Sequence, residues 1–161
     1  MSECLNGQLA SLPAGALAPD FSLQQAPHAH VALHSLRGYP IVLVFYPMDW
    51  EPVSREQLRL YQTYSDDFAR FGAQVLGIST DHVYSHEAFA HDAQIRFPLL
   101  ADFEPRGSVA RQYGVFRDTQ GVSARALFVL HPRRIIRFGK VYPDALNPGV
   151  DELLTTFEAL T

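Results

Sequence analysis

Four segments along the chain have the length and composition of strands. They are rich in Val, Ile, Leu and Phe and are too short for independent helices. These segments cover residues 41–46, 74–79, 125–130 and 135–141. Polar and apolar side chains alternate through residues 28–33, which predicts a shorter, half-buried strand.

Between these segments, apolar side chains recur at intervals of three and four residues. In residues 55–71 the stripe predicts a helix with one core-facing side, which ends before Gly72. Ser85 is the expected N-cap of a helix that continues to about residue 94. Further helices are expected over residues 105–113 and from residue 149 to about residue 160.

The order of these elements predicts an α/β fold. Alternating strands and helices, followed by two adjacent strands and a final helix, favour a mixed sheet with helices on both faces. We divide the chain into an N-terminal arm or hairpin, residues 1–17, and one domain, residues 18–161.

Charge and hydropathy restrict the environment and the partners. A net charge of −4 argues against a nucleic-acid partner. No apolar run approaches the roughly 18 residues of a membrane helix, and the N-terminus lacks the pattern of a signal peptide. Cys4 is the only cysteine, so an intrachain disulfide is impossible; we expect a passive thiol and a cytoplasmic protein.

The segment from Tyr46 to Ser54 is the strongest candidate for chemistry. It connects the first apolar run to the helix expected after it. A loop in this position ends at a helix N-terminus, where unpaired N–H groups and the helix dipole stabilise an anion. Ser54 is therefore expected in the first turn of a helix that begins near Pro52.

This segment resembles the active-site motif of the peroxiredoxins, which is Pro, three residues, Thr, two residues, Cys. Here the corresponding residues are Pro47, Glu51 and Ser54. Further segments resemble the family in their order and spacing: residues 18–23, 75–81 with 85–89, 95–102, and 113–115 with 125–132.

The resemblance implies a thioredoxin fold with peroxiredoxin-type insertions, and a family activity of thiol-dependent peroxide reduction. In that chemistry a Cys thiolate attacks the peroxide, a Pro shields it, and a Thr and a distant Arg hold the peroxide. Carried over, the site residues are Pro47, Glu51 in place of Thr, Ser54 in place of Cys, and Arg125.

A serine hydroxyl is a weak nucleophile without a positioned base, so we expect no thiol-peroxidase activity from this chain. The alternative is a non-catalytic binding or regulatory module that accepts peroxide or another small polar ligand. Two origins of Ser54 remain open, divergence within the family or an introduced Cys→Ser exchange. Glu51 favours divergence, because a glutamate raises the pKa of a neighbouring thiolate.

Two orientations of Glu51 remain open: an ion pair with Arg125, or a side chain directed to solvent. The resemblance also implies a homodimer, since family members commonly pair through the active-site loops or sheet edges. Aromatic residues that could supply its interface are Tyr46, Trp50, Phe116 and Tyr142.

The seven histidines raise the possibility of a metal site, since His82, His86 and His91 are close in sequence. No cysteine or paired carboxylate completes a ligand set, so we expect surface histidines and no metal. Ser54 lacks the Gly-x-Ser-x-Gly elbow of serine hydrolases. Without a phosphate-binding glycine loop or a Cys-x-x-Cys motif, we expect no cofactor.

Overall fold

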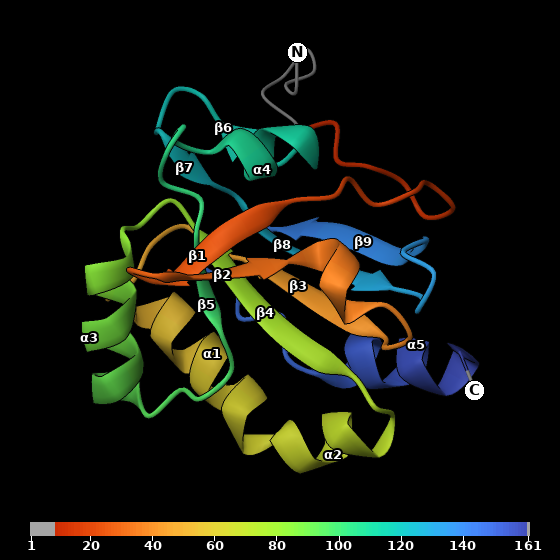
Figure 1. Cartoon of the computed structure of the whole chain (residues 1–161). Helices are drawn as coiled ribbons and strands as arrows, with labels where there is room; N and C mark the ends of the chain where they lie inside the picture. Colours follow the sequence, from red (N-terminus) through yellow and green to blue (C-terminus); the bar gives the residue numbers. More distant parts are fainter. Residues whose placement is uncertain (1–8, 161) are drawn as a thin grey trace.

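The computed structural model describes residues 9–160, which build one mixed seven-stranded sheet (Figure 1). Its strand order is β2-β1-β5-β4-β3-β8-β9. The strands are β1 Ser22–Ala26, β2 Ala29–Ala32, β3 Ile41–Phe45, β4 Gln74–Ser79, β5 Leu99–Ala101, β8 Arg125–Leu130 and β9 Ile136–Tyr142. A separate hairpin pairs β6 Phe116–Arg117 with β7 Val122–Ser123.

Strand β3 lies near the centre of this sheet. It runs parallel to β4 and antiparallel to β8, and all five of its side chains are buried. Alternate side chains of a strand point to opposite faces, so β3 contributes to two cores. The predicted mixed α/β sheet is confirmed.

Helices cover both faces, although unequally. The helices are α1 Pro52–Thr63, α2 Ser65–Arg70, α3 Val83–Ala93, α4 Ser108–Gln112 and α5 Asp151–Leu160, with a 3-10 turn η1 at Leu33–Leu36. Val42 and Val44 face a core that α1, α2, α3 and α5 close. Leu43 and Phe45 face a second core closed by α4, η1 and the N-terminal arm.

Three predicted helices have different bounds. The helix expected over residues 105–113 is shorter, because α4 begins at Ser108 and ends at Gln112. The helix expected over residues 55–71 begins at Pro52 and is interrupted at Tyr64, where ψ is 14°. Ser85 is not an N-cap: α3 begins at Val83, and the ring of His82 accepts the cap hydrogen bond from the Tyr84 N–H.

The described part of the N-terminal arm, residues 9–17, packs against the domain. Leu12 N–H donates to the Tyr113 carbonyl, and Gly15 N–H donates to the Ile136 carbonyl. Gly114 must be glycine here, since a Cβ would lie 2.2 Å from the Ala10 carbonyl oxygen. Cys4, predicted to be a passive thiol, lies outside the described residues.

The predicted aromatic interface patch is wrong for three of its four residues. Tyr46, Phe116 and Tyr142 are at most 4% exposed and belong to the cores, whereas Trp50 is 51% exposed. Among residues 9–160, no helix combines the length and the apolar character needed to cross a membrane.

Candidate active site

The loop after β3 ends in a well-capped helix N-terminus. Glu51 is the N-cap of α1: its carboxylate accepts hydrogen bonds from the N–H groups of Val53 at 2.6 Å and Ser54 at 3.1 Å. Pro52 occupies the first helical turn, where its missing N–H costs nothing. The predicted position of Ser54, in the first turn of a helix that begins at Pro52, is confirmed.

Arg125 reaches this helix terminus from the neighbouring strand. It is the first residue of β8, and the pairing of Phe45 with Ala126 brings the start of β8 beside the end of β3. Its Nη1 donates to the Ser54 hydroxyl at 3.2 Å and to Gln57 Oε1 at 2.8 Å. Ser54 and Arg125, which the family resemblance assigns to one site, are thus in direct contact, and both side chains are buried.

Glu51 forms the ion pair with Arg125 and is not directed to solvent. The Glu51 Oε1 to Arg125 Nη2 distance is 2.6 Å, and the Glu51 side chain is 25% exposed. Partial burial by itself would raise the pKa of Glu51, but hydrogen bonds from Ser54 and Arg125 outweigh it and hold that pKa below its usual value.

Each N–H group of the Arg125 guanidinium has a partner within the protein. A guanidinium has five such donors. Besides the bonds to Ser54, Gln57 and Glu51, Nε and Nη2 donate to the Asp144 carbonyl at 3.2 Å and 2.8 Å. The side chain is fully buried, so a further ligand would have to displace one of these partners.

The Ser54 hydroxyl is equally enclosed. It is buried, donates to Glu51 Oε1 at 2.8 Å and accepts from Arg125. Pro47, the remaining predicted site residue, is buried in the loop between β3 and α1. The structure thus brings Glu51, Ser54 and Arg125 into direct contact, with Pro47 in the segment that leads to them.

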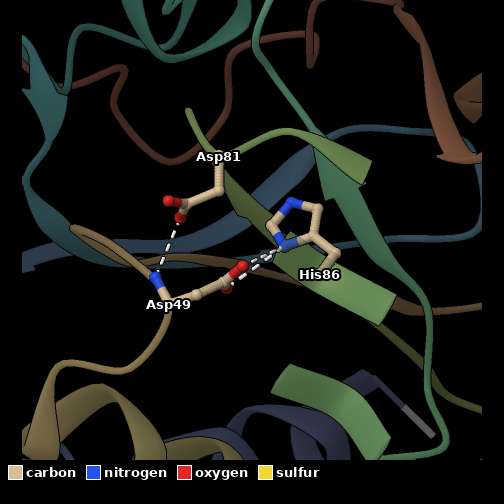
Figure 2. Close-up of side chains that lie close together, drawn as sticks. All are labelled: Asp49, Asp81 and His86. Atoms are coloured by element: carbon tan, nitrogen blue, oxygen red, sulfur yellow. Dashed lines mark hydrogen bonds and ion pairs between the residues drawn. The ribbon is translucent and has the colours of Figure 1, made fainter. Parts of the chain in front are cut away.

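A second buried polar cluster involves the same loop through Asp49 (Figure 2). The carboxylate of Asp49 contacts the Nδ1 atom of His86 at 2.8 Å, and the Asp49 N–H donates to Asp81 Oδ2 at 2.8 Å. Tyr46 and Ser85 donate hydroxyl hydrogen bonds to Asp49 at 2.7 Å and 2.9 Å. The interpretation of His86 as a surface residue is wrong, since it is 2% exposed.

Both ring nitrogens of His86 have partners in this cluster. His86 Nε2 faces the Leu100 carbonyl at 3.0 Å, and a carbonyl can only accept, so Nε2 carries a hydrogen. His86 Nδ1 faces the two Asp49 carboxylate oxygens at 3.1 Å and 2.8 Å. The buried side chains of Asp49 and His86 are thus directly paired.

The ligand atoms of Asp49, Asp81 and His86 lie within 4.8 Å of one another, a spacing that could hold a metal ion. The two carboxylates beside His86 contradict the expectation that no paired carboxylate accompanies the histidines. His86 Nε2 is paired with the Leu100 carbonyl and Nδ1 with Asp49, so a metal ion at Nδ1 would have to displace the Asp49 contact. Burial raises the pKa of Asp81, and the Asp49 carboxylate raises it further. We therefore interpret the cluster as a brace that ties the loop before Glu51 to β4 and α3.

Comparison with known proteins agrees with this architecture. The AhpC/TSA family model matches residues 14–138, which is most of the chain. The chain belongs to the AhpC/TSA family. It is 33% identical over 152 residues to Peroxiredoxin 2 of Thermoplasma acidophilum, covering 91% of this chain and 75% of that protein.

Other members of the AhpC/TSA family are similarly related. Alkyl hydroperoxide reductase E of Mycobacterium tuberculosis is 34% identical over 131 residues, 81% of this chain and 86% of its own. The crystal structure of peroxidoxin BcpB from Mycobacterium tuberculosis superposes with a TM-score of 0.82 and 29% identity, covering 92% of this chain and 97% of that one. The crystal structure of Enterococcus faecalis AhpC superposes with a TM-score of 0.82 and 25% identity, covering 91% of this chain and 90% of that one. The thioredoxin-type fold of these peroxiredoxins is therefore the fold of this chain.

The pH dependence of stability should report the Glu51–Arg125 pair. Because the Glu51 pKa is lowered by folding, its stabilisation is present above the unfolded value, about 4.3, and is lost as the pH falls through the folded value. Glu51→Gln should cost about 2 kcal/mol at neutral pH, because it leaves Arg125 buried without a counter-charge. Urea unfolding should show that the difference from wild type shrinks below a pH of about 4. The control Glu56→Gln, exposed in the same helix, should change stability by less than about 0.5 kcal/mol; a pH-independent cost of Glu51→Gln would contradict the pair.

The buried contact between Asp49 and His86 predicts a large difference between two histidines of α3. His86→Ala should lower the free energy of unfolding by about 3–5 kcal/mol, because it leaves the Asp49 carboxylate buried without its His86 partner. His91→Ala, at an exposed position of the same helix, should cost less than about 0.5 kcal/mol. Denaturant unfolding at neutral pH measures both, and equal losses would show that Asp49 and His86 do not form an ion pair.

Proposed function

We propose that this chain is a non-catalytic member of the AhpC/TSA family, which lacks thiol-peroxidase activity and acts through binding. Ser54 stands where the family motif places its peroxidatic cysteine, and Glu51 stands at the threonine position. A thiol titrates near pH 8.5 and is readily activated at a helix N-terminus, whereas a serine hydroxyl remains a weak nucleophile.

One observation carries the proposal: the site already contains its own anion. The Glu51 carboxylate accepts hydrogen bonds from Arg125, from the Ser54 hydroxyl and from two helix N–H groups. These groups are the donors that would otherwise hold a peroxide oxygen. With all five Arg125 donors in use, peroxide would have to displace a partly buried, ion-paired carboxylate.

A second copy of the chain is the partner that the surface favours. Four exposed apolar side chains follow the carboxyl ends of the parallel strands β3, β4 and β5; these are Met48, Trp50, Tyr84 and Phe103. We refer to them as the apical patch. The His82 ring supports part of it, with ring centroids 5.1 Å from Tyr84 and 4.9 Å from Phe103. Apolar side chains beside the active-site loop are consistent with the pairing mode that the family resemblance implies.

A peroxide assay on three variants tests the catalytic part of the proposal. The wild-type chain should not reduce hydrogen peroxide. Ser54→Cys alone should react slowly, since a thiolate about 4 Å from the Glu51 carboxylate is repelled by up to about 4 kcal/mol at an effective dielectric near 20. Arg125 offsets part of this, which leaves a thiol pKa raised by roughly two units.

Ser54→Cys combined with Glu51→Thr should react faster than Ser54→Cys, because the carboxylate is gone and a hydroxyl donor is present. Stopped-flow measurement of peroxide reaction rates distinguishes the variants, and Glu51→Thr alone is the inactive control. Peroxide turnover by the wild-type chain would refute the proposal. Equal rates for the single and double variants would show that Glu51 does not obstruct the site.

The apical patch is tested by sedimentation. The wild-type chain should sediment above the 18.0 kDa of one protomer, and Trp50→Glu combined with Tyr84→Glu should return it to that mass. Tyr39→Glu combined with Leu146→Glu introduces the same charges at exposed apolar positions outside the patch and should leave the dimer intact. A wild-type monomer at high concentration would exclude the dimer.

A further inference from the structure

Two turns meet at the end of the sheet opposite to Ser54. One turn, residues 36–40, leads into β3, and the other, residues 131–134, connects β8 to β9 (Figure 1). The Gly38 N–H donates to the Pro132 carbonyl at 3.3 Å and joins them. The register confirms their distance from the site, because Ile41 pairs with Leu130 here and Phe45 pairs with Ala126 at the Ser54 end.

These turns enclose a surface hollow of about 430 Å³. We refer to it as the arginine hollow, since three of its lining residues are arginines; the lining residues are Arg37, Gly38, His131, Pro132, Arg133 and Arg134. Its volume lies in the range of small-molecule sites, roughly 300–1,000 Å³.

The charge of the hollow is strongly positive and poorly neutralised. Within residues 9–160, neither Arg37 nor Arg133 has a carboxylate within ion-pair distance, and both are exposed. The one carboxylate near Arg134 in the described part of the chain is that of Asp20, at 3.8 Å, and it also contacts His34 at 2.9 Å. A chain with a net charge of −4 thus gathers three guanidinium groups around one hollow.

The backbone of Arg134 adds an independent indication. Its φ is +66°, a left-handed conformation that an L-residue adopts at a cost and that hairpin turns usually assign to glycine. Backbone in such sparsely populated conformations is held in place by the surrounding structure and is found most often at functional sites. At this position glycine would remove the strain and also remove one of the three charges.

We propose that the arginine hollow binds a small, soluble, phosphate-bearing anion. The planar guanidinium fork matches two phosphate oxygens at once, which makes arginine the preferred side chain for phosphate. The net negative charge of the chain disfavours a long polyanion such as RNA, whereas a compact anion meets only the local field. The site is separate from Ser54 and does not depend on the proposed function.

Calorimetric titration with pyrophosphate at low ionic strength tests this proposal. The wild-type chain should bind one pyrophosphate per protomer, and added salt should weaken the binding. Arg37→Ala combined with Arg133→Ala should weaken it at least tenfold. Arg59→Ala combined with Arg96→Ala removes the same charge from another exposed surface and should leave the affinity within twofold. Absence of wild-type binding, or equal losses in both double variants, would overturn the proposal.

The Arg134→Gly variant distinguishes a loss of pyrophosphate binding from a loss of stability. Because glycine is unstrained at this φ, the melting temperature should equal or exceed that of the wild type, while pyrophosphate affinity should fall several-fold. An unchanged affinity would exclude Arg134 from the site and overturn the assignment.

Binding of the wild-type chain to vesicles that contain phosphatidic acid is measured in parallel. If the chain binds these vesicles but not pyrophosphate, the hollow recognises a lipid surface, and the proposal of a soluble ligand is overturned.

Discussion

The fully buried guanidinium of Arg125 is the constraint on which the site depends. A guanidinium that is removed from water needs a hydrogen-bond acceptor for every N–H donor, because each unpaired donor lowers the stability of the fold. A buried charge without a counter-charge lowers it further. Its partners come from the α1 cap, the first turns of α1 and the loop after β9. Gln57 continues this network by donating to Tyr61, whose hydroxyl donates to the Gly149 carbonyl just before α5. A single side chain thus aligns β8, α1 and the approach to α5.

The loop between β3 and α1 lies between two buried ionic centres. Arg125 and Glu51 hold its end, and the Asp49–His86 pair holds its middle. The two centres are independent in sequence, since β8 supplies Arg125 and α3 supplies His86. Loops are usually the least constrained part of a domain, but this loop is constrained at two points, which suits a site that keeps one conformation whether or not a ligand is present.

Much of the architecture was predictable because its signals are local. The strands at residues 41–46, 74–79 and 125–130 are continuous apolar runs, and the helix N-terminus at Pro52 follows from proline and an acidic cap. The contact between Arg125 and Ser54, 71 positions apart, was accessible only through the family resemblance. Local patterns carry no information on such a pairing, since it depends on the register between β3 and β8.

The errors also have physical causes. His86 lies on the same helical stripe as the buried residues Val83, Phe89 and Ala93, so its burial was visible in the spacing, but its polar character suggested the surface. The strands β6 and β7 have two residues each and are too short for a periodic signal. Nothing in the local sequence explains the interruption of the helix at Tyr64. Three of the four aromatic residues predicted at an interface belong to the cores. An aromatic residue type alone does not distinguish core from surface, because burial depends on which face of the strand or helix the side chain occupies.

Trp50 gives the loop a property that no other segment of this protein has. It is the only tryptophan of the chain, it precedes Glu51 directly, and it combines a left-handed φ of +71° with a half-exposed ring packed edge-on against Phe89. Selectively excited indole fluorescence therefore originates at one point, beside the carboxylate that closes the site. The emission wavelength and the quenching of this natural fluorophore therefore report the surroundings of the loop, including its contact with Phe89 of α3, without an attached label.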